Sequence, residues 1–421
     1  MNIGSIIKMN RLKQNLKQED LAEGIISTSY LSKIENGKIE PNDEVIKLLC
    51  MRLDIEINRQ IDEETRELCY NWFHILLTSF KPSILKQEYQ RMSELTNTIP
   101  DLELQILLKI HVIRYFLKIG ETNSSLEQIN QLKEISTTFS GKQKYYWFKF
   151  NGNYHSITEE DSKALQFYTM AEDLIAKNDL PDEEIADLQY VLGVTYSKLR
   201  LTSEAQSYAN KALDFYRQIY NFSRCAECHL ILGISYRRIQ NYDKAIKNYQ
   251  LAKQLAEHDD TTEIIQLTHL NLGYLYYAQG KTDQAIKYLD MIVEEKESSL
   301  ENRLLALTAI VEEYYKANNY EEAKRRIEEG LGLITEENKE RYLLFYYEIY
   351  TYRHLTERNL EKFEEMMVHE FIPYLEEQKD YARLTNYATL LANYYEDLHK
   401  YKTATKYYKL VNFSYKQINQ I

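Results

Sequence analysis

The chain has 421 residues and a formal net charge of −12, which argues against a generally basic nucleic-acid-binding protein. It holds only 5 Pro and 12 Gly among abundant helix-forming residues, so we expect a nearly all-helical protein, and its four Cys are too few for a disulfide scaffold. Residues 1–60 contain nine basic and nine acidic residues, so the whole acidic excess lies in residues 61–421. Only the N-terminal segment is therefore suited to approach DNA phosphates.

Signals for export or membrane insertion are not expected in this sequence. The first residues, Met1 to Gly4, lead into polar and charged sequence rather than the apolar core of a signal peptide. No run of 18 apolar residues occurs anywhere. We expect a soluble, cytoplasmic protein that does not contact a membrane.

The first sixty residues predict four short helices. Gly24 and Gly37 suit the left-handed conformation that ends a helix. Ser27 or Thr28 can cap the third helix, and Asn42 can cap the fourth. The expected helices cover residues 3–15, 17–23, 28–35 and 43–53. Two short helices joined by a tight turn that contains glycine predict a helix-turn-helix.

A family resemblance supports this prediction. The segment resembles the helix-turn-helix domains of the phage-repressor (Cro/C1, XRE) class at Arg11, Gln18-x-x-Leu21-Ala22, Ser27-x-Ser29-x-Leu31-Ser32-x-Ile34-Glu35-x-Gly37 and Pro41. The stretch from Ala22 to Glu35 is one residue shorter than in most of that class. The resemblance implies sequence-specific binding of double-stranded DNA, with the second helix of the motif in the major groove.

The same resemblance points to individual DNA contacts. Thr28, Ser29 and Lys33 match base-reading positions, and Lys33 could reach a guanine edge. Gln18 matches a residue that holds a backbone phosphate. The candidate DNA-binding residues are Gln18, Ser27, Thr28, Ser29, Tyr30, Lys33, Asn36 and Lys38. In contrast, we expect a structural role for Glu35 and core positions for Leu21, Ala22, Leu31, Ile34 and Val45.

The rest of the chain contains an internal repeat. Gly152, Gly193, Gly233 and Gly273 recur at intervals of 41, 40 and 40 residues. In the clearest unit, the tetratricopeptide signature appears at offsets 0, 3, 12, 16 and 19 as Gly233, Tyr236, Ala245, Tyr249 and Ala252. Weaker copies surround Ala323, Phe363 and Ala404, while residues 66–140 look helical without the signature. We expect seven to nine helix pairs in a right-handed superhelical solenoid with a concave inner surface.

These observations predict an all-α protein with two domains. A helix-turn-helix domain is expected over residues 1–60, a linker over 61–70 and a tetratricopeptide-like repeat domain over 71–421. The small residues of the signature are expected where the two helices of a pair cross closely.

The inner surface of the solenoid predicts a binding groove. The first helix of each pair lines this surface, and offsets −2, +1 and +5 from the glycine fall on one helix face. That face carries apolar residues, two basic residues and Asn at intervals, a pattern that suits an extended peptide. The candidate peptide-binding residues are Asn153, Lys198, Arg238, Asn271, Tyr274 and Asn393. The alternative is that these side chains pack against the next repeat or form local hydrogen bonds.

Catalytic and metal-binding motifs are not apparent. The Cys225-x-x-Cys228 pair has no second pair of ligands, and a structural zinc ion needs four, so we expect both cysteines to pack within the repeat. The sequence has no phosphate-binding loop and no recognisable catalytic triad. We expect neither catalysis nor a metal or cofactor.

The combination of a repressor-type domain with tetratricopeptide-like repeats resembles the Rap–Rgg–NprR–PlcR–PrgX group of peptide-sensing regulators. This resemblance implies a homodimer or tetramer, a short signalling peptide in the groove and a two-fold symmetric operator. We therefore expect a quorum-sensing transcriptional regulator. A second hypothesis stays open, in which the repeat array sequesters a response regulator and DNA binding is secondary.

Overall fold

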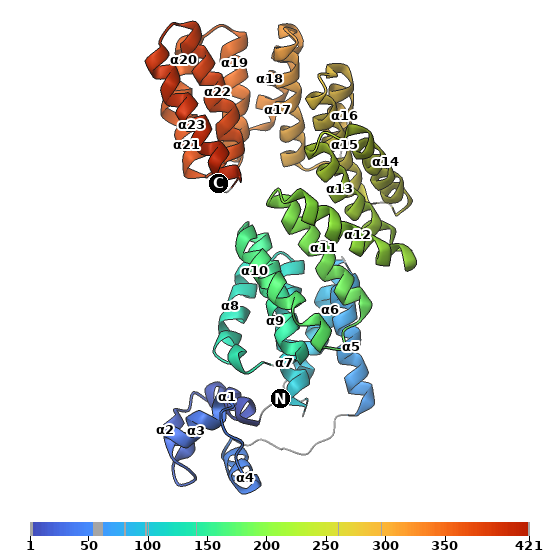
Figure 1. Ribbon diagram of the computed structural model, residues 1–421, viewed down its shortest axis with the longest axis vertical. Helices are drawn as coiled ribbons and strands as arrows, with labels where there is room; N and C mark the ends of the chain where they lie inside the picture. The colour runs from blue at the N-terminus through green and yellow to red at the C-terminus, as the bar shows by residue number, and fades with distance from the viewer. Residues whose placement is uncertain are drawn as a thin grey trace. The chain divides into compact units, whose positions relative to one another are not determined.

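The computed structural model describes residues 3–53, 62–79, 81–96, 99, 101–139, 141–259, 261–295 and 297–419. Every element of regular structure within these residues is a helix, which confirms the predicted all-α fold class (Figure 1). The chain divides into two compact units, residues 1–219 and residues 220–421.

The first unit begins with the helix-turn-helix domain. Its helices are α1 (Ile3–Lys13), α2 (Gln18–Ala22), α3 (Thr28–Glu35) and α4 (Asp43–Arg52). Ser27 caps α3, with its Oγ accepting from the Tyr30 N–H at 3.2 Å, and Asn42 caps α4 through Val45 at 2.8 Å. Gly24 and Gly37 have φ values of 71° and 67°. The predicted helices, caps and terminating glycines are therefore confirmed.

The core of this domain follows the predicted apolar pattern. Leu21, Ala22, Leu31 and Ile34 are buried together with Ile7, Leu49, Cys50 and Leu53. Val45 is half-buried and packs against the edge of this core rather than within it. The core thus fixes α3 against α1 and α2 and leaves the opposite face of α3 to solvent.

Helices continue through the rest of the first unit. They are α5 (Glu63–Thr78), α6 (Pro82–Thr96), α7 (Leu102–Lys118), α8 (Thr122–Lys133), α9 (Gly141–Ile157), α10 (Asp161–Glu172), α11 (Asp182–Lys198) and α12 (Thr202–Gln218), with the short 3-10 helices η1 (Ser136–Thr138) and η2 (Ile175–Lys177). Helix α5 begins inside the 61–70 segment that was expected as a linker, while residues 54–61 lie outside the described residues.

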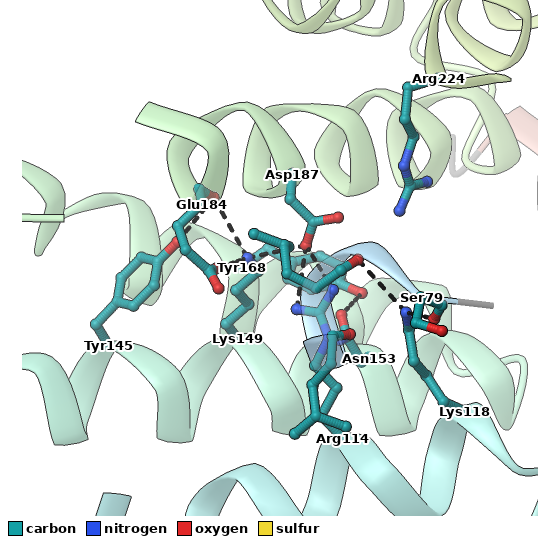
Figure 2. A network of polar contacts seen from close by, with 12 residues as sticks. Ser79, Arg114, Lys118, Tyr145, Lys149, Asn153, Tyr168, Glu184, Asp187 and Arg224 are labelled. Atoms are coloured by element: carbon teal, nitrogen blue, oxygen red, sulfur yellow. Dashed lines mark hydrogen bonds and ion pairs between the residues drawn. The ribbon is translucent and has the colours of Figure 1, made fainter. Parts of the chain in front are cut away.

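A buried network of charges joins three helices of the first unit (Figure 2). Lys149 on α9 is fully buried, and its Nζ lies 2.9 Å from Asp187 Oδ2 on α11 and also contacts the Glu184 carboxylate. Arg114 on α7 reaches the same Asp187 oxygen at 3.3 Å and donates to the Leu76 carbonyl at 3.0 Å. Because each buried charge faces an opposite charge, the network ties α7, α9 and α11 together.

The second unit consists of further helix pairs. Its helices are α13 (Phe222–Arg238), α14 (Tyr242–His258), α15 (Thr262–Ala278), α16 (Thr282–Glu294), α17 (Leu300–Lys316), α18 (Tyr320–Leu333), α19 (Leu343–Thr356), α20 (Leu360–Met366), the π-helix η3 (Met367–Phe371), α21 (Ile372–Glu377), α22 (Tyr381–Asp397) and α23 (Tyr401–Asn419). Counting α20 to α21 as one helix, the described residues of both units form nine pairs, within the predicted range.

The signature glycines lie where the two helices of a pair meet. A β-carbon at Gly152 would lie 2.5 Å from the Tyr168 ring, and one at Gly233 would overlap the Tyr249 ring. At Gly193 the neighbour is the partner helix backbone itself, with Ala209 N at 3.2 Å from such a carbon. Each pair therefore crosses as closely as the repeat signature predicted.

Neither a membrane-spanning helix nor a metal-binding cluster occurs among the described residues. No helix among them is both long enough and apolar enough to cross a membrane. Within the same residues, no group of three or more His, Cys, Asp or Glu side chains is placed to hold a metal ion. Cys225 and Cys228 are both buried on α13.

Candidate DNA-binding surface and repeat-domain site

The predicted reading helix presents a polar face to solvent. Thr28, Ser29 and Lys33 are exposed on α3, and Ser27 is exposed at its N-terminus. Hydroxyl and ammonium groups on an exposed helix face have the chemistry needed to reach base edges and phosphates in a major groove. Lys38 and Asn36 are exposed directly beyond the helix. Six of the eight candidate residues therefore lie at the surface around one short helix.

An ion pair holds the reading helix against α1. Arg11 Nε lies 2.6 Å from Glu35 Oε1, and Arg11 Nη2 lies 2.9 Å from Glu35 Oε2. Glu35 is fully buried and Arg11 nearly so. Gln18 at the start of α2 donates to Glu35 Oε2 at 2.6 Å. The predicted structural role of Glu35 is confirmed, and this residue links α1, α2 and α3.

Three of the candidate residues have structural contacts of their own. The Gln18 side chain is half-buried, and its amide donates to Glu35 within the domain. Its contact with a DNA phosphate stays a prediction. Tyr30 is half-buried against the core of the domain rather than fully available for a base. Asn36 donates from Nδ2 to the Ser32 carbonyl at 2.7 Å. Thr28, Ser29 and Lys33 thus remain the strongest candidates for base contacts.

Acidic side chains lie next to the reading helix. Glu19, Asp20 and Glu23 on or beside α2 line a shallow hollow of about 490 Å³ together with Ser27 and Thr28. Carboxylates at this position repel DNA phosphates and lower the affinity of a single domain. Strong binding would therefore require two such domains held at half-site spacing.

In the repeats of the first unit, two candidate peptide-binding residues have partners within the unit. Asn153 on α9 accepts a hydrogen bond at Oδ1 from the Tyr168 hydroxyl on α10, at 2.8 Å (Figure 2). Lys198 at the end of α11 is exposed, donates to the Ser156 carbonyl at 3.2 Å and lies 3.3 Å from Asp161 Oδ1. These contacts are the local interactions that formed the alternative reading, so ligand binding by either residue stays a prediction.

The second unit holds the other four candidates. Asn393 on α22 accepts at Oδ1 from the Tyr408 hydroxyl on α23 at 2.7 Å, which repeats the Asn153 to Tyr168 arrangement. Asn271 on α15 donates to the Leu267 carbonyl of its own helix at 2.8 Å. Arg238 is half-buried at the end of α13. Tyr274 is half-buried on α15, and burial raises the pKa of its hydroxyl.

Around Tyr274 the structure assembles a polar cluster that was not predicted. The Tyr277 hydroxyl on α15 donates to Glu312 Oε1 on α17 at 2.9 Å, and Lys316 Nζ lies 2.7 Å from the same oxygen. Burial raises the pKa of Tyr352 on α19, and a hydrogen bond to Glu312 adds to this effect. Three consecutive first helices of the repeats therefore meet at one carboxylate.

A second ion pair extends the cluster to α22. Arg383 Nε donates to Glu348 Oε1 on α19 at 2.9 Å, and Arg383 Nη1 donates to Asp380 Oδ2 at 2.9 Å. Burial raises the pKa of Glu348, while Arg383 opposes that shift. Glu348, Arg383 and Glu312 also influence the pKa of Tyr274. We name the group Tyr274, Tyr277, Glu312, Lys316, Glu348, Tyr352 and Arg383 the inner polar cluster.

The sequence held a signal for part of this cluster. Tyr314 marks offset +3 of a weak repeat, so Glu312 lies at offset +1 and Lys316 at offset +5. These offsets belong to the helix face that was predicted to bind a peptide in the clearer repeats. That repeat has Val311 at offset 0 in place of the glycine, so the recurring glycines do not mark this face. Glu348 and Arg383 lie in repeats with weaker signatures, so their pairing needed the structure.

Known protein families match both the helix-turn-helix segment and the repeat segment of the chain. A helix-turn-helix family model matches residues 7–59. Tetratricopeptide repeat models match residues 186–219 and 225–294. These matches cover the reading helix and the clearest repeats.

Two curated relatives are similar over most of the chain. The transcriptional activator NprA of Geobacillus stearothermophilus is 34% identical over 400 residues, covering 93% of this chain and 97% of the relative. The chain belongs to the Rap–Rgg–NprR–PlcR–PrgX family. The response regulator aspartate phosphatase A of Bacillus subtilis (strain 168) is 26% identical over 318 residues, covering 73% of this chain and 81% of the relative.

Solved structures of family members share the fold. The apo form of the quorum sensor NprR from B. thuringiensis has a TM-score of 0.72 at 20% identity, covering 84% of this chain and 99% of that one. NprR in complex with its cognate peptide NprX has a TM-score of 0.62 at 21% identity, covering 84% and 98%. The family membership and the fold predicted from sequence are therefore confirmed.

Proposed function

We propose that this protein is a transcriptional regulator whose binding to promoter DNA is controlled by a short signalling peptide. Its similarity over nearly its whole length to a transcriptional activator carries this proposal. Residues 1–60 form the DNA-binding domain, residues 61–70, which include the first turns of α5, join it to the repeats, and residues 71–421 bind the peptide and form the homo-oligomer. Because its target is promoter DNA, the protein acts in the cytoplasm, and it acts as a regulator rather than as an enzyme.

The exposed face of α3 supports the DNA-binding half of the proposal. Lys33 reaches base edges, while Lys38 and Asn36 contact phosphates. Since acidic residues adjoin the reading helix, one domain binds weakly and two domains bind a two-fold symmetric operator together. A peptide that changes the spacing of the two domains then changes DNA affinity, and coupling of about 1–3 kcal/mol is enough for control.

The first helices of the repeats support the peptide-binding half. In the second unit, Tyr274 belongs to the inner polar cluster, and Asn271 lies one turn before it on α15. Arg383 and Lys316 of the cluster can hold carboxylates, and Glu312 can accept from a peptide N–H. Asn153, Lys198, Arg238 and Asn393 complete the candidate contacts. The peptide-bound structure of NprR, a member of the family with the same fold, supports a peptide as the ligand.

A second function rests on another relative. The similarity to a response regulator aspartate phosphatase favours a repeat array that binds a response regulator. In that case the array would sequester a partner protein, and DNA binding would be secondary.

Selection of bound fragments from sheared genomic DNA, with and without a library of short peptides, tests the proposal. We expect a two-fold symmetric site whose recovery changes with one peptide. Lys33→Ala should weaken binding to that site by about 1–3 kcal/mol, whereas Lys47→Ala, an exposed lysine on α4, is the control. No enriched site under either condition would contradict the proposal and favour the response-regulator function.

The peptide arm has its own matched variants. Asn271 and Asn210 both donate from Nδ2 to a carbonyl of their own helix at 2.8 Å, but Asn210 lies on α12, the second helix of its pair. We expect Asn271→Ala to weaken peptide binding, measured by calorimetry on the full chain, and Asn210→Ala to leave it unchanged. Equal losses in both variants would argue against the assigned surface.

A further inference from the structure

A small cavity lies between first helices of the repeats in the first unit, near the ends where α9 and α11 begin. Its volume is about 180 Å³, and its apolar wall comes from Tyr70, Phe73 and Leu77 on α5, Leu107 on α7 and Pro181 directly before α11. An apolar cavity of about 150 Å³ can hold a molecule of benzene, whereas drug-sized ligands need about 300–1,000 Å³. The cavity therefore has room for one apolar side chain.

One tyrosine hydroxyl inside the cavity has no partner. Tyr146 on α9 lines the cavity and is only 6% exposed. Its hydroxyl forms no hydrogen bond with any described residue, yet the oxygen is not sealed from solvent. Burial raises the pKa of this hydroxyl, so it keeps its proton and acts as a donor. Because a buried tyrosine hydroxyl usually finds a hydrogen-bond partner, a ligand that offers an acceptor fits this position.

A lysine adds a second donor on the same side of the cavity. Lys142 lies one turn before Tyr146 on α9, and residues four apart share a helix face. Its side chain is half-buried, and its ammonium has no ion-pair or hydrogen-bond partner among the described residues. An ammonium and a hydroxyl that face one cavity can together donate to a carboxylate.

The opposite side of the cavity carries negative charge. Glu183 and Glu184, in the first turn of α11, both belong to the lining. The Glu184 carboxylate already contacts the buried Lys149 (Figure 2). The Glu183 side chain is 22% exposed, and its Oε2 lies 3.6 Å from Nδ1 of His74, an exposed residue that is charged only when protonated. Glu183 is therefore the carboxylate that can take an ammonium group from a ligand.

We propose that this cavity binds a free apolar α-amino acid. The side chain of the amino acid fills the apolar slot, its carboxylate accepts from Lys142 Nζ and the Tyr146 hydroxyl, and its ammonium donates to Glu183. Such a zwitterion supplies one charge of each sign, as the lining does. A simple acid would leave Glu183 without a partner, and a simple amine would leave Lys142 without one.

The cavity is separate from the candidate peptide contacts but lies on the same face of α9. Tyr146 precedes Asn153 by seven residues, which is about two helical turns, so the two side chains share a face at different heights. The bound amino acid would also join α9 and α11 to α5, the helix that follows the DNA-binding domain in the chain. We expect this link to change operator affinity, an effect that rests on the proposed function.

Calorimetric titration of the full-length protein with three matched probes tests the ligand class. L-leucine carries both charges, L-leucinamide lacks the carboxylate, and 4-methylpentanoate lacks the ammonium. We expect saturable binding of L-leucine and at least about tenfold weaker binding of each analogue, since each loses a charge-assisted hydrogen bond. No saturable binding of either L-leucine or L-phenylalanine would overturn the proposal. Equal affinity for L-leucine and L-leucinamide would also overturn it, because the N-terminal residue of a peptide would then fit as well as a free amino acid.

Substitutions identify the groups that hold each charge. We expect Lys142→Met, Tyr146→Phe and Glu183→Gln each to weaken L-leucine binding about tenfold. Lys142→Met should also narrow the gap between L-leucine and L-leucinamide, whereas Glu183→Gln should narrow the gap between L-leucine and 4-methylpentanoate. The controls are Lys144→Met and Tyr154→Phe, which lie on α9 outside the cavity and should bind L-leucine normally. Unchanged binding in both Lys142→Met and Tyr146→Phe would overturn the proposal.

The regulatory part has its own measurement. Affinity for the selected operator is compared with and without L-leucine, in the absence of peptide. A change that is lost in Tyr146→Phe would support control through this cavity. Saturable binding of L-leucine without any change in operator affinity would overturn the regulatory part alone. In that case both the amino-acid site and the proposed function would stand, and failure to select any operator would leave the binding result unaffected.

Discussion

Arg11 and Glu35 form a buried, two-pronged ion pair between α1 and α3, with N–O distances of 2.6 Å and 2.9 Å. The guanidinium also donates from Nη1 to the Leu16 carbonyl at 2.8 Å, at the turn before α2. The planar fork of arginine matches a carboxylate in both position and direction, which a lysine could not do. This pair therefore fixes the orientation of α3 relative to α1.

Removal of the carboxylate should loosen the reading helix. Glu35→Ala leaves Arg11 buried without its counter-ion and deprives Gln18 of its acceptor, and breaking such a pair costs about 3–5 kcal/mol. We expect amide hydrogen exchange in α1–α4 to accelerate strongly and operator binding to be lost. Glu40→Ala, at an exposed site in the same domain, should change neither. Unaltered exchange in Glu35→Ala would show that the apolar core alone positions α3.

The helix-turn-helix domain could be predicted closely because its signals are local. Ser27 and Asn42 cap helices that begin at the next residue, and Gly24 and Gly37 adopt the positive φ that made them terminators. The contacts of Asn153 and Asn393 could not be predicted in this way. Both residues were placed on the binding face by helical periodicity, yet each accepts a hydrogen bond from a tyrosine 15 residues later, on the partner helix. Helical periodicity predicts which face of the helix a side chain lies on, but it does not predict which side chains of the partner helix bond to it.

Gly233 offers a test of close helix packing in the repeats. A β-carbon there would overlap the ring of Tyr249, which is fully buried and cannot move aside without disturbing α14. We expect Gly233→Ala to destabilise the second unit by about 1–3 kcal/mol, as overpacking does. Amide exchange in α13 and α14 measures this effect.

The matched control for this substitution is Gly332→Ala. Gly332 lies on α18, and a β-carbon at that position meets nothing within 4 Å. Alanine favours the helix over glycine by about 0.5–1 kcal/mol, so this variant should be slightly more stable than the wild type. Destabilisation in both variants to the same extent would mean that the clash with Tyr249 is not the cause.

Lys149 tests the buried charge network of the first unit. Lys149→Met removes the cation that faces Glu184 and Asp187, and Arg114 alone cannot neutralise both carboxylates. We expect a loss of about 3–5 kcal/mol in the stability of this unit. Both tryptophans lie in the first unit, so their fluorescence during denaturant unfolding measures the loss. Lys163→Met, which removes an exposed pair with Glu160, should cost at most about 1 kcal/mol.

This charge network could not be predicted from the sequence. Arg114, Lys149 and Asp187 lie 35 and 38 residues apart, at positions that the tetratricopeptide signature does not define. A lysine in a helix normally predicts solvent exposure, since its charge is costly to bury. Only the side-by-side packing of α7, α9 and α11 shows that the charges compensate one another inside the unit. The inner polar cluster of the second unit was missed for the same reason.

His111, one turn before Arg114 on α7, should make the first unit sensitive to acid. Its ring is buried, stacks on Phe73 with 3.8 Å between centroids, and donates from Nδ1 to the Leu107 carbonyl at 2.7 Å. Burial lowers its pKa from 6.5 to about 3, and the nearby positive charges of Arg114 and Lys149 add to this effect. Between pH 6.5 and about 3, His111 therefore binds a proton in the unfolded chain but stays neutral in the folded protein.

Stability should consequently fall as the pH drops from 6.5 towards 3, since the unfolded state binds more protons in this window. Between pH 7.5 and 5.5 the loss from this one residue is about 1.4 kcal/mol. His111→Phe keeps an aromatic ring against Phe73 and should flatten the dependence, whereas His399→Phe, at an exposed position in the second unit, should not alter it. Denaturant unfolding followed by tryptophan fluorescence at both pH values gives the comparison. If His111→Phe and the wild type lose the same stability between these pH values, the buried imidazole is not the group that titrates.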